Sequence, residues 1–190
     1  MTATFRIDDI SLNTNPSKLA EITKVLKEKY IDCKIILAIS PIVFDMSNAQ
    51  GLDSERPFPK ILNAQSDWTV FLKGQLSGVP SWLHNLEWQN FQLASHGLVH
   101  VDHRFLTLEA QEMSVLISCS IVGSKMFVPP FNKWDANTEQ ICAKHGLDLI
   151  KWEDGWNHLA YQRVSTSSSG LFYFHTHDFS LEELSRKLSE

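Results

Sequence analysis

The sequence predicts a single α/β domain over residues 1–190, and three observations support this class. A nearly continuous apolar run at 33–40 is typical of a parallel strand that is covered on both faces. Apolar residues recur at helical spacing before this run, so that a strand, a helix and a second strand follow one another. Candidate chemical groups then recur where strand-like runs end, as they do in α/β folds.

Length and composition fit one globular domain with a sizeable core. Of the 190 residues, 43% are hydrophobic and 21% are charged, which are ordinary values. The formal net charge of −5 and the lack of a basic run argue against a nucleic-acid partner. No apolar stretch approaches the ~20 residues that span a bilayer, and no apolar leader precedes the first strand, so we expect a cytoplasmic protein without a transmembrane segment. Three widely spaced cysteines are expected to be buried free thiols: Cys33, Cys119 and Cys142.

The first third of the chain contains the predicted strand-helix-strand unit. Residues 4–7 read as a short strand that ends at a pair of aspartates. Asn15 as N-cap and Pro16 at the first helical position open a helix that ends near residue 30. After the apolar run, the pattern weakens over 41–66, which indicates a long loop over the mouth of the fold.

The middle third contains a second strand of clear pattern. Residues 68–72 are expected to form a short strand, and the tryptophans within 82–88 are expected to pack a short helix. Residues 91–95 alternate apolar with polar or small residues, as a strand with one buried face does. Thr107 caps a helix that runs to about residue 122. Its apolar residues are expected to face inward: Leu108, Met113, Leu116 and Ile117.

The last third again alternates strands with helices. A strand at 125–131 is broken by a double proline, which fixes the local backbone and has no N–H to donate. The remaining elements are a helix capped by Asp135 and closed at Gly146, strands at 147–152 and 171–178 with a polar turn at 165–170 between them, and a last helix opened by a Ser180–Glu183 capping box.

Two histidines follow the strand at 91–95, at the point where Gly97 breaks its pattern. His96 and His100 are four residues apart, so a roughly helical turn places both imidazoles on one face, about 5–6 Å apart. A catalytic zinc needs about three protein ligands and an open position for water, and Asp9 is the best candidate for the third ligand. Such a ligand set favours hydrolysis of an acyl bond. A His-rich surface turn and a solvated aspartate pair are the alternatives.

Four segments stand out by their residues and their order along the chain: Phe5-Arg-Ile-Asp8-Asp9, His96-Gly-Leu-Val-His100, Phe127-Val-Pro129-Pro130-Phe131 and Phe172-Tyr-Phe-His175. In this order they resemble the polysaccharide deacetylases, which are the NodB-homology or family 4 carbohydrate esterases. The resemblance covers almost the whole chain and implies a distorted (β/α) barrel of fewer than eight strands. It also implies a metal-dependent deacetylase that removes an N-acyl group, usually acetyl, from an amino sugar or a precursor of a surface polysaccharide such as an O-antigen.

By position, the resemblance assigns the metal ligands and the two groups that transfer protons. Asp9, His96 and His100 would hold the metal. Asp8 would be the general base that activates water, and His175 would be the general acid that protonates the leaving amine. Zinc is the default metal for this ligand set, with Co²⁺, Mn²⁺, Ni²⁺ or Fe²⁺ as alternatives on ligand type.

The double-proline turn supplies the remaining expected contacts with the substrate. The backbone N–H of Phe131 or Asn132 would help to hold the oxyanion, and Phe131 and Trp134 would wall the acetyl pocket. His177 competes with His175 for the role of general acid because both point to the same strand face. We favour His175, because Tyr-Phe-His is how this strand ends in related deacetylases.

The chain departs from the family pattern at the residue before the double proline. The family usually has an arginine there that orients the base, whereas this chain has Val128. Arg6, Arg104 and Lys133 are the candidates to replace it. His103, next to Arg104, is a further candidate site residue.

Two more departures keep other functions open. Gly97 stands where the family commonly has Ser or Thr, and Ile10 stands where Gly is frequent. The alternatives are a degenerate, non-catalytic carbohydrate-binding domain, an amidohydrolase that acts on a non-sugar N-acyl substrate, and a surface His cluster unrelated to catalysis. The sequence indicates neither the sugar and acyl group nor the oligomeric state.

Overall fold

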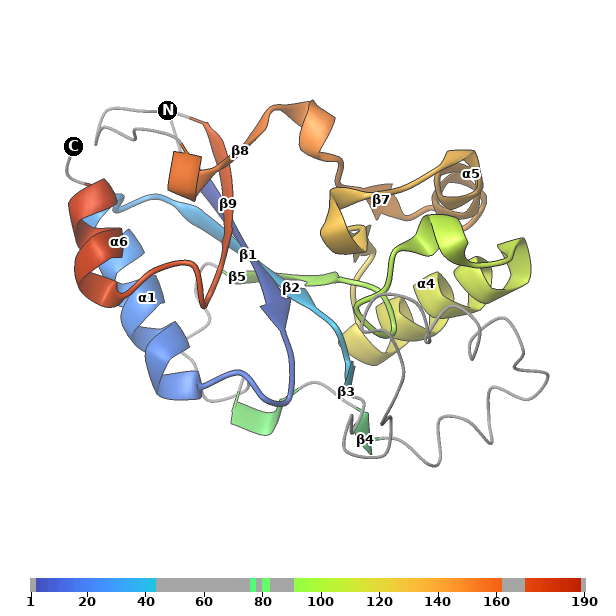
Figure 1. Cartoon of the computed structure of the whole chain (residues 1–190), viewed down its shortest axis with the longest axis horizontal. Coiled ribbons are helices and arrows are strands. Elements are labelled where there is room, and N and C mark those ends of the chain that lie inside the picture. The colour runs from blue at the N-terminus through green and yellow to red at the C-terminus, as the bar shows by residue number, and fades with distance from the viewer. Residues whose placement is uncertain (1–2, 44–75, 78–79, 83–90, 162–169, 189–190) are drawn as a thin grey trace.

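The computed structural model describes residues 3–43, 76–77, 80–82, 91–161 and 170–188. Within these residues, seven parallel strands form one curled sheet in the order β7-β6-β5-β2-β1-β9-β8, a half-barrel with helices around it (Figure 1). This architecture confirms the expected distorted (β/α) barrel of fewer than eight strands. The strands are β1 (Thr4–Ile10), β2 (Lys34–Ile39), β5 (Phe91–Ser95), β6 (Met126–Phe127), β7 (Asp148–Leu149), β8 (Trp156–His158) and β9 (Leu171–His175).

The helices form two groups on the outside of this sheet. Helices α1 and α6 lie together beside β1 and β9, and α4 and α5 lie together on the other flank (Figure 1). A separate antiparallel pair joins β3 (Ile42–Val43) to β4 (Leu76–Ser77). The helices are α1 (Pro16–Lys29), α4 (Leu108–Val122), α5 (Ala136–Lys144) and α6 (Leu181–Lys187).

The strand-helix-strand unit β1-α1-β2 forms as the sequence predicts. The Asn15 side chain accepts hydrogen bonds from two backbone N–H groups of the first turn, and Pro16 occupies the first helical position. Leu19 and Leu26 lie fully buried in the same core cluster as Phe5 of β1. This cluster fixes the central pair of strands, and therefore the position of the two aspartates of β1.

The predicted inward face of α4 is confirmed in part, because Met113 and Ile117 pack against a buried core cluster whereas Leu108 does not. Leu108 is 52% exposed, whereas Gln111, Ser114 and Ser118 are fully buried. The Ser118 and Ser95 hydroxyls lie 2.6 Å apart, and Ser114 Oγ accepts the N–H of Leu98 at 3.2 Å. Polar side chains can be buried here because each has a hydrogen-bond partner. The inward face of α4 therefore holds the end of β5 and the loop after it.

Other predictions differ in extent or fall outside the described residues. Strand β1 continues through both aspartates to Ile10, and β7 has two residues of the predicted 147–152. The three-residue strand β8 was not predicted. The predicted strand at 68–72, most of the helix at 82–88, and most of the segments 41–66 and 165–170 lie outside the described residues.

Two expectations about chemistry and location can be compared with this fold. All three cysteines are buried and free, as predicted. Among the described residues, no helix combines the length and the apolar character that crossing a bilayer requires.

Gly97 shapes the loop that follows β5. Its φ of 76° lies in the left-handed region. A Cβ on Gly97 would lie 3.0 Å from Pro130 Cγ, 3.1 Å from His103 Nε2 and 3.1 Å from the carbonyl oxygen of Val99. The backbone of this loop therefore lies directly against the double-proline turn, and a serine or threonine at this position would crowd it.

Replacing Gly97 should destabilise the protein more than replacing a glycine that has the same backbone but free space. For Gly97→Ala we expect the free energy of unfolding to fall by about 2–4 kcal/mol, because left-handed strain and overpacking add. The control is Gly146→Ala, where φ is 62° and no atom lies within 4 Å of the new Cβ; it should lose about 1–2 kcal/mol. Urea denaturation measures both, and equal losses would contradict the crowding.

Candidate active site

The predicted site residues come together at the carboxyl ends of neighbouring strands. Asp8 and Asp9 belong to the end of β1, His96 follows β5, the double-proline turn follows β6, and His175 ends β9. These strands are parallel, so their carboxyl ends lie at one edge of the sheet. Segments that are almost the whole chain apart thereby contribute to one cluster.

The three predicted metal ligands lie within coordination reach of one another. Asp9 Oδ1 is 3.3 Å from His96 Nε2 and 3.0 Å from His100 Nε2. This carboxylate oxygen is buried and has no hydrogen-bond partner among the described residues, although two ring nitrogens face it. One oxygen and two nitrogens that converge in this way suit a divalent cation with an open coordination position. The residues present therefore fit the metal that the resemblance implies.

Neighbouring groups fix the ionisation and the orientation of these ligands. Burial by itself would raise the pKa of Asp9, but the imidazoles of His100 and His96 outweigh burial and hold that pKa well below its ordinary value. His96 Nδ1 donates to the carbonyl oxygen of Val128 at 2.9 Å, which turns Nε2 toward Asp9. Val128 thus contributes through its backbone.

The backbone of Asp9 explains how adjacent aspartates serve different partners. Its φ of 61° departs from strand geometry, and the pairing of β1 with β2 shifts register between Ile7 and Ile10. Such a conformation costs on the order of 1–3 kcal/mol for a residue other than glycine. The irregularity frees Asp9 from the strict alternation of the strand, so that Asp9 faces the histidines while Asp8 keeps its place on the strand face of Arg6.

Asp8 forms a buried ion pair with Arg6 of the same strand. Arg6 Nε donates to Asp8 Oδ1 and Arg6 Nη2 donates to Asp8 Oδ2, both at 2.8 Å, and the two side chains are 0% and 1% exposed. The same Nη2 donates to Asn132 Oδ1 at 2.6 Å. The guanidinium lies between the rings of Trp156 and Tyr173, 5.0 and 4.8 Å from their centroids. Of the three cations considered from the sequence, the structure therefore pairs Arg6 with Asp8.

His175 approaches the other carboxylate oxygen of Asp9, whereas His96 and His100 approach Oδ1. His175 Nε2 is 3.8 Å from Asp9 Oδ2, and its Nδ1 is 3.0 Å from Asp178 Oδ2. His158 of β8 also approaches Asp178, with its Nε2 3.3 Å from Oδ2. His177 is 71% exposed at its side chain and stacks on the outside of the His175 ring. His175 is therefore the histidine that faces Asp9.

The double-proline turn places an aromatic ring and one free amide beside the cluster. The Phe131 ring lies 4.2 Å from the ring of His100, and the Phe131 side chain stays half exposed. Asn132 N–H donates to the carbonyl oxygen of Pro129 at 3.0 Å, so the expectation that this amide is available for an oxyanion was wrong. Phe131 remains as the candidate amide. Both residues have positive φ, 58° and 53°.

The other predicted site residues lie next to the cluster. His103 is fully buried behind the loop, with its Nε2 3.2 Å from Ser114 Oγ, and it does not join the metal-ligand group. Arg104 pairs with Asp102 at 2.7 Å. Trp134 lines a pocket that shares Asn132 with the site and includes none of the three predicted metal ligands, and its expected place in the wall of the acetyl pocket stays a prediction.

Two side chains of this cluster were missed at the sequence level. Asp178 follows His175 by three residues at the end of a strand, and this spacing is a signal for a paired carboxylate and imidazole. His158 had no such signal, because its short strand was not predicted. Together with His175 they form a second group of ligand-type atoms within 4.8 Å of one another.

Comparison with known proteins shows solved structures of the same fold, all at low sequence identity. No protein-family model and no curated protein sequence matches the chain. Among solved structures, a peptidoglycan N-acetylglucosamine deacetylase matches with TM-score 0.56 at 13% identity, over 98% of this chain and 78% of that one. A family 4 pseudoenzyme from Bacillus anthracis gives 0.54 at 10%, over 98% and 58%. A family 4 carbohydrate esterase from Streptomyces lividans, in complex with acetate, gives 0.51 at 11%, over 98% and 86%. The chain therefore has the fold of the NodB-like polysaccharide deacetylases.

The buried His103 should make stability depend on pH. Burial, with the nearby His96 second, lowers the pKa of His103 from 6.5 to about 4. Between these values the unfolded chain takes up a proton that the folded chain does not, so the free energy of unfolding should fall by up to about 3 kcal/mol as the pH drops from 6.5 to 4. Denaturation of chelator-treated protein at several pH values measures this. In His103→Gln, the slope of the free energy of unfolding against pH should fall by the equivalent of about one proton. If this slope is unchanged, groups other than His103 cause the pH dependence.

Proposed function

We propose that this protein is a metal-dependent deacetylase that hydrolyses an N-acyl group, N-acetyl by default, of an amino sugar or a surface-polysaccharide precursor. One observation carries the proposal: Asp9, His96 and His100 converge at the strand ends, with the buried Asp8–Arg6 pair and His175 beside them. The fold shared with solved deacetylases supports it.

Asp9, His96 and His100 hold the divalent ion, with Zn²⁺ as the default and Co²⁺, Mn²⁺, Ni²⁺ or Fe²⁺ as alternatives. When bound, such an ion polarises the acyl carbonyl and makes water more acidic. The protein contributes the orientation of each ligand. His96 is fixed through its Nδ1 by the carbonyl of Val128, and the His100 ring is packed by Phe131.

Asp8 acts as the general base, and Arg6 holds it. A carboxylate has about four lone-pair sites, and the two bonds from Arg6 leave others to accept a proton from water. The guanidinium supplies the charge that a buried carboxylate needs and fixes its plane through a bidentate contact. Arg6 is a positioning residue. In this proposal it takes the part of the arginine that the family usually has at the position of Val128.

His175 acts as the general acid for the leaving amine. Its Nδ1 bond to Asp178 leaves Nε2 facing Asp9, on the side where the scissile bond would lie. The N–H of Phe131 donates to the oxyanion, and the exposed Phe131 ring covers the acyl group. His177 lies outside this arrangement.

Two other functions are compatible with the same fold. A non-catalytic carbohydrate-binding domain is the first, because a family 4 pseudoenzyme shares this architecture. The second is hydrolysis of a non-sugar N-acyl substrate, for which the residues around the ligand cluster would be the same. Turnover separates the first from the proposal, and substrate choice separates the second.

Acetate release should depend on the metal and on Asp8. We expect purified protein to release acetate from a panel of N-acetylated amino sugars, to lose this activity with a chelator, and to regain it with Zn²⁺ or Co²⁺. Asp8→Asn should lower kcat by about 10²–10⁴-fold, the usual contribution of a general base, while the metal content stays unchanged. Glu21→Gln in α1 is a matched surface control. A wild-type protein that binds metal but releases no acyl group from sugar or non-sugar amides would indicate the binding domain.

The bidentate geometry of Arg6 should matter beyond its charge. Arg6→Lys keeps a cation but cannot make the two parallel bonds, so we expect kcat to fall by at least about tenfold with a smaller change in KM. Arg6→Gln removes the charge and should cost about 3–5 kcal/mol of stability as well, because it strands a buried carboxylate. Steady-state kinetics and denaturation on both variants check this. If Arg6→Lys retains wild-type kcat, Arg6 has only a structural role.

A further inference from the structure

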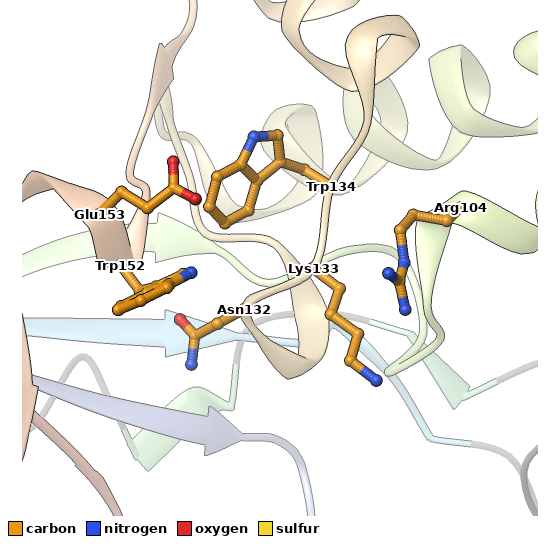
Figure 2. A pocket seen from close by; sticks show the side chains of 6 residues that line it. All are labelled: Arg104, Asn132, Lys133, Trp134, Trp152 and Glu153. Atoms are coloured by element: carbon orange, nitrogen blue, oxygen red, sulfur yellow. The ribbon is translucent and has the colours of Figure 1, made fainter.

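A polar pocket opens directly beside the site described above. It has a volume of about 330 Å³, within the range of small-molecule sites, and six residues line it: Arg104, Asn132, Lys133, Trp134, Trp152 and Glu153 (Figure 2). Three of these follow one another in the chain after the double-proline turn, and none is a metal ligand. The mechanism proposed above does not use this pocket.

Asn132 connects the pocket to the catalytic groups. Its Oδ1 accepts from Arg6 Nη2, the atom that also holds Asp8, and the preceding Phe131 packs on the metal ligand His100. The pocket therefore begins one residue away from the aromatic ring that covers the acyl position. A substrate whose acyl group lies at the metal would extend into it.

One side of the pocket is cationic. Lys133 and Arg104 share one carboxylate: Asp102 Oδ2 is 2.7 Å from Arg104 Nη2 and 3.9 Å from Lys133 Nζ. The Asp135 carboxylate also acts on Arg104, so the cationic character of this side rests on which charged groups are exposed. The Arg104 and Lys133 side chains are 43% and 51% exposed, whereas that of Asp102 is 10% exposed. The cations, and not their counter-ion, are presented to solvent.

The opposite side of the pocket is aromatic. Trp152 is half exposed, and Figure 2 shows Trp134 and Trp152 with Glu153 on the side away from Lys133 and Arg104. Indole rings offer flat apolar surfaces against which the C–H face of a sugar ring can pack. Glu153 would repel an anion from that side and bring it toward the cations.

We propose that this pocket is a specificity subsite for an acidic amino sugar, in which Lys133, supported by Arg104, binds a carboxylate or phosphate group of the substrate. The substrate class rests on the deacetylase function proposed above, but the anion site itself rests on the pocket alone. Asn132 lines the pocket and also accepts from Arg6, so we test anionic groups on the ring carbons next to the acylamino carbon.

The experiment compares three N-acetylated sugars that differ at such a neighbouring carbon. N-acetylglucosamine is neutral, N-acetylmuramic acid carries a carboxylate and N-acetylglucosamine 1-phosphate carries a phosphate. We expect wild-type kcat/KM to be at least about tenfold higher for one or both anionic sugars than for the neutral one, as one charge-assisted contact provides. Which anionic sugar is preferred distinguishes carboxylate from phosphate.

Lys133→Gln should reduce the anionic-to-neutral ratio of kcat/KM by about tenfold, and Lys133→Glu should reduce it further. Lys133 is the preferred variant because replacing Arg104 would strand Asp102. Lys24→Gln is the control, since Lys24 is an exposed lysine of α1 outside the pocket. The ratio should also fall with added salt, as expected for half-exposed charges.

The outcomes separate this inference from the proposed function. Equal turnover of neutral and anionic sugars by wild type and Lys133→Gln overturns the subsite and leaves the deacetylase standing. If no sugar is turned over, calorimetric titration of wild type and Lys133→Gln with the same three sugars decides. Binding of the anionic sugars that is lost in Lys133→Gln supports the subsite. Binding that is the same in both proteins, or no binding at all, overturns it.

Discussion

The ion pair between Arg6 and Asp8 is the interaction on which the architecture of this site depends. A carboxylate that is 1% exposed would be unstable without a charge partner, and the bidentate guanidinium provides one in a fixed plane. The guanidinium lies over the rings of Trp156 and Tyr173, and its third hydrogen bond reaches Asn132, in the turn after β6. The buried guanidinium of Arg6 thereby contacts β1, the aromatic residues of β8 and β9, and the turn after β6.

The rest of the fold holds the candidate metal ligands Asp9, His96 and His100 close to this pair. Helix α4 buries hydroxyl and amide groups where an ordinary amphipathic helix would bury leucines, and these groups hold the loop that carries His96 and His100. Gly97 lets that loop approach Pro130 closely. The carbonyl of Val128 then orients His96. Ligand positions thus depend on backbone contacts between loops at one edge of the sheet.

The residues at this edge of the sheet could be predicted from the sequence because one simple rule of parallel sheets applies. Parallel strands end at the same edge, so the motifs after the predicted strands had to meet, and Asp9 does lie between His96 and His100. The partner of Asp8 was left open among three cations, although Arg6 and Asp8, two apart on one strand, share a face. Three features were missed because short or non-local structure decides them. They are the three-residue β8 with His158, the polar residues that α4 buries while Leu108 stays exposed, and the Asn132 amide, whose N–H donates within its own turn.

The placement of Arg6 also bears on how divergent members of such a fold are sorted into active and inactive ones. A comparison that scores only the position of Val128 would count the charge partner of the proposed base, Asp8, as lost, whereas the structure has the guanidinium of Arg6 at this carboxylate, from β1. Absence of a motif residue is therefore poor grounds for declaring a pseudoenzyme until the space around the carboxylate has been inspected.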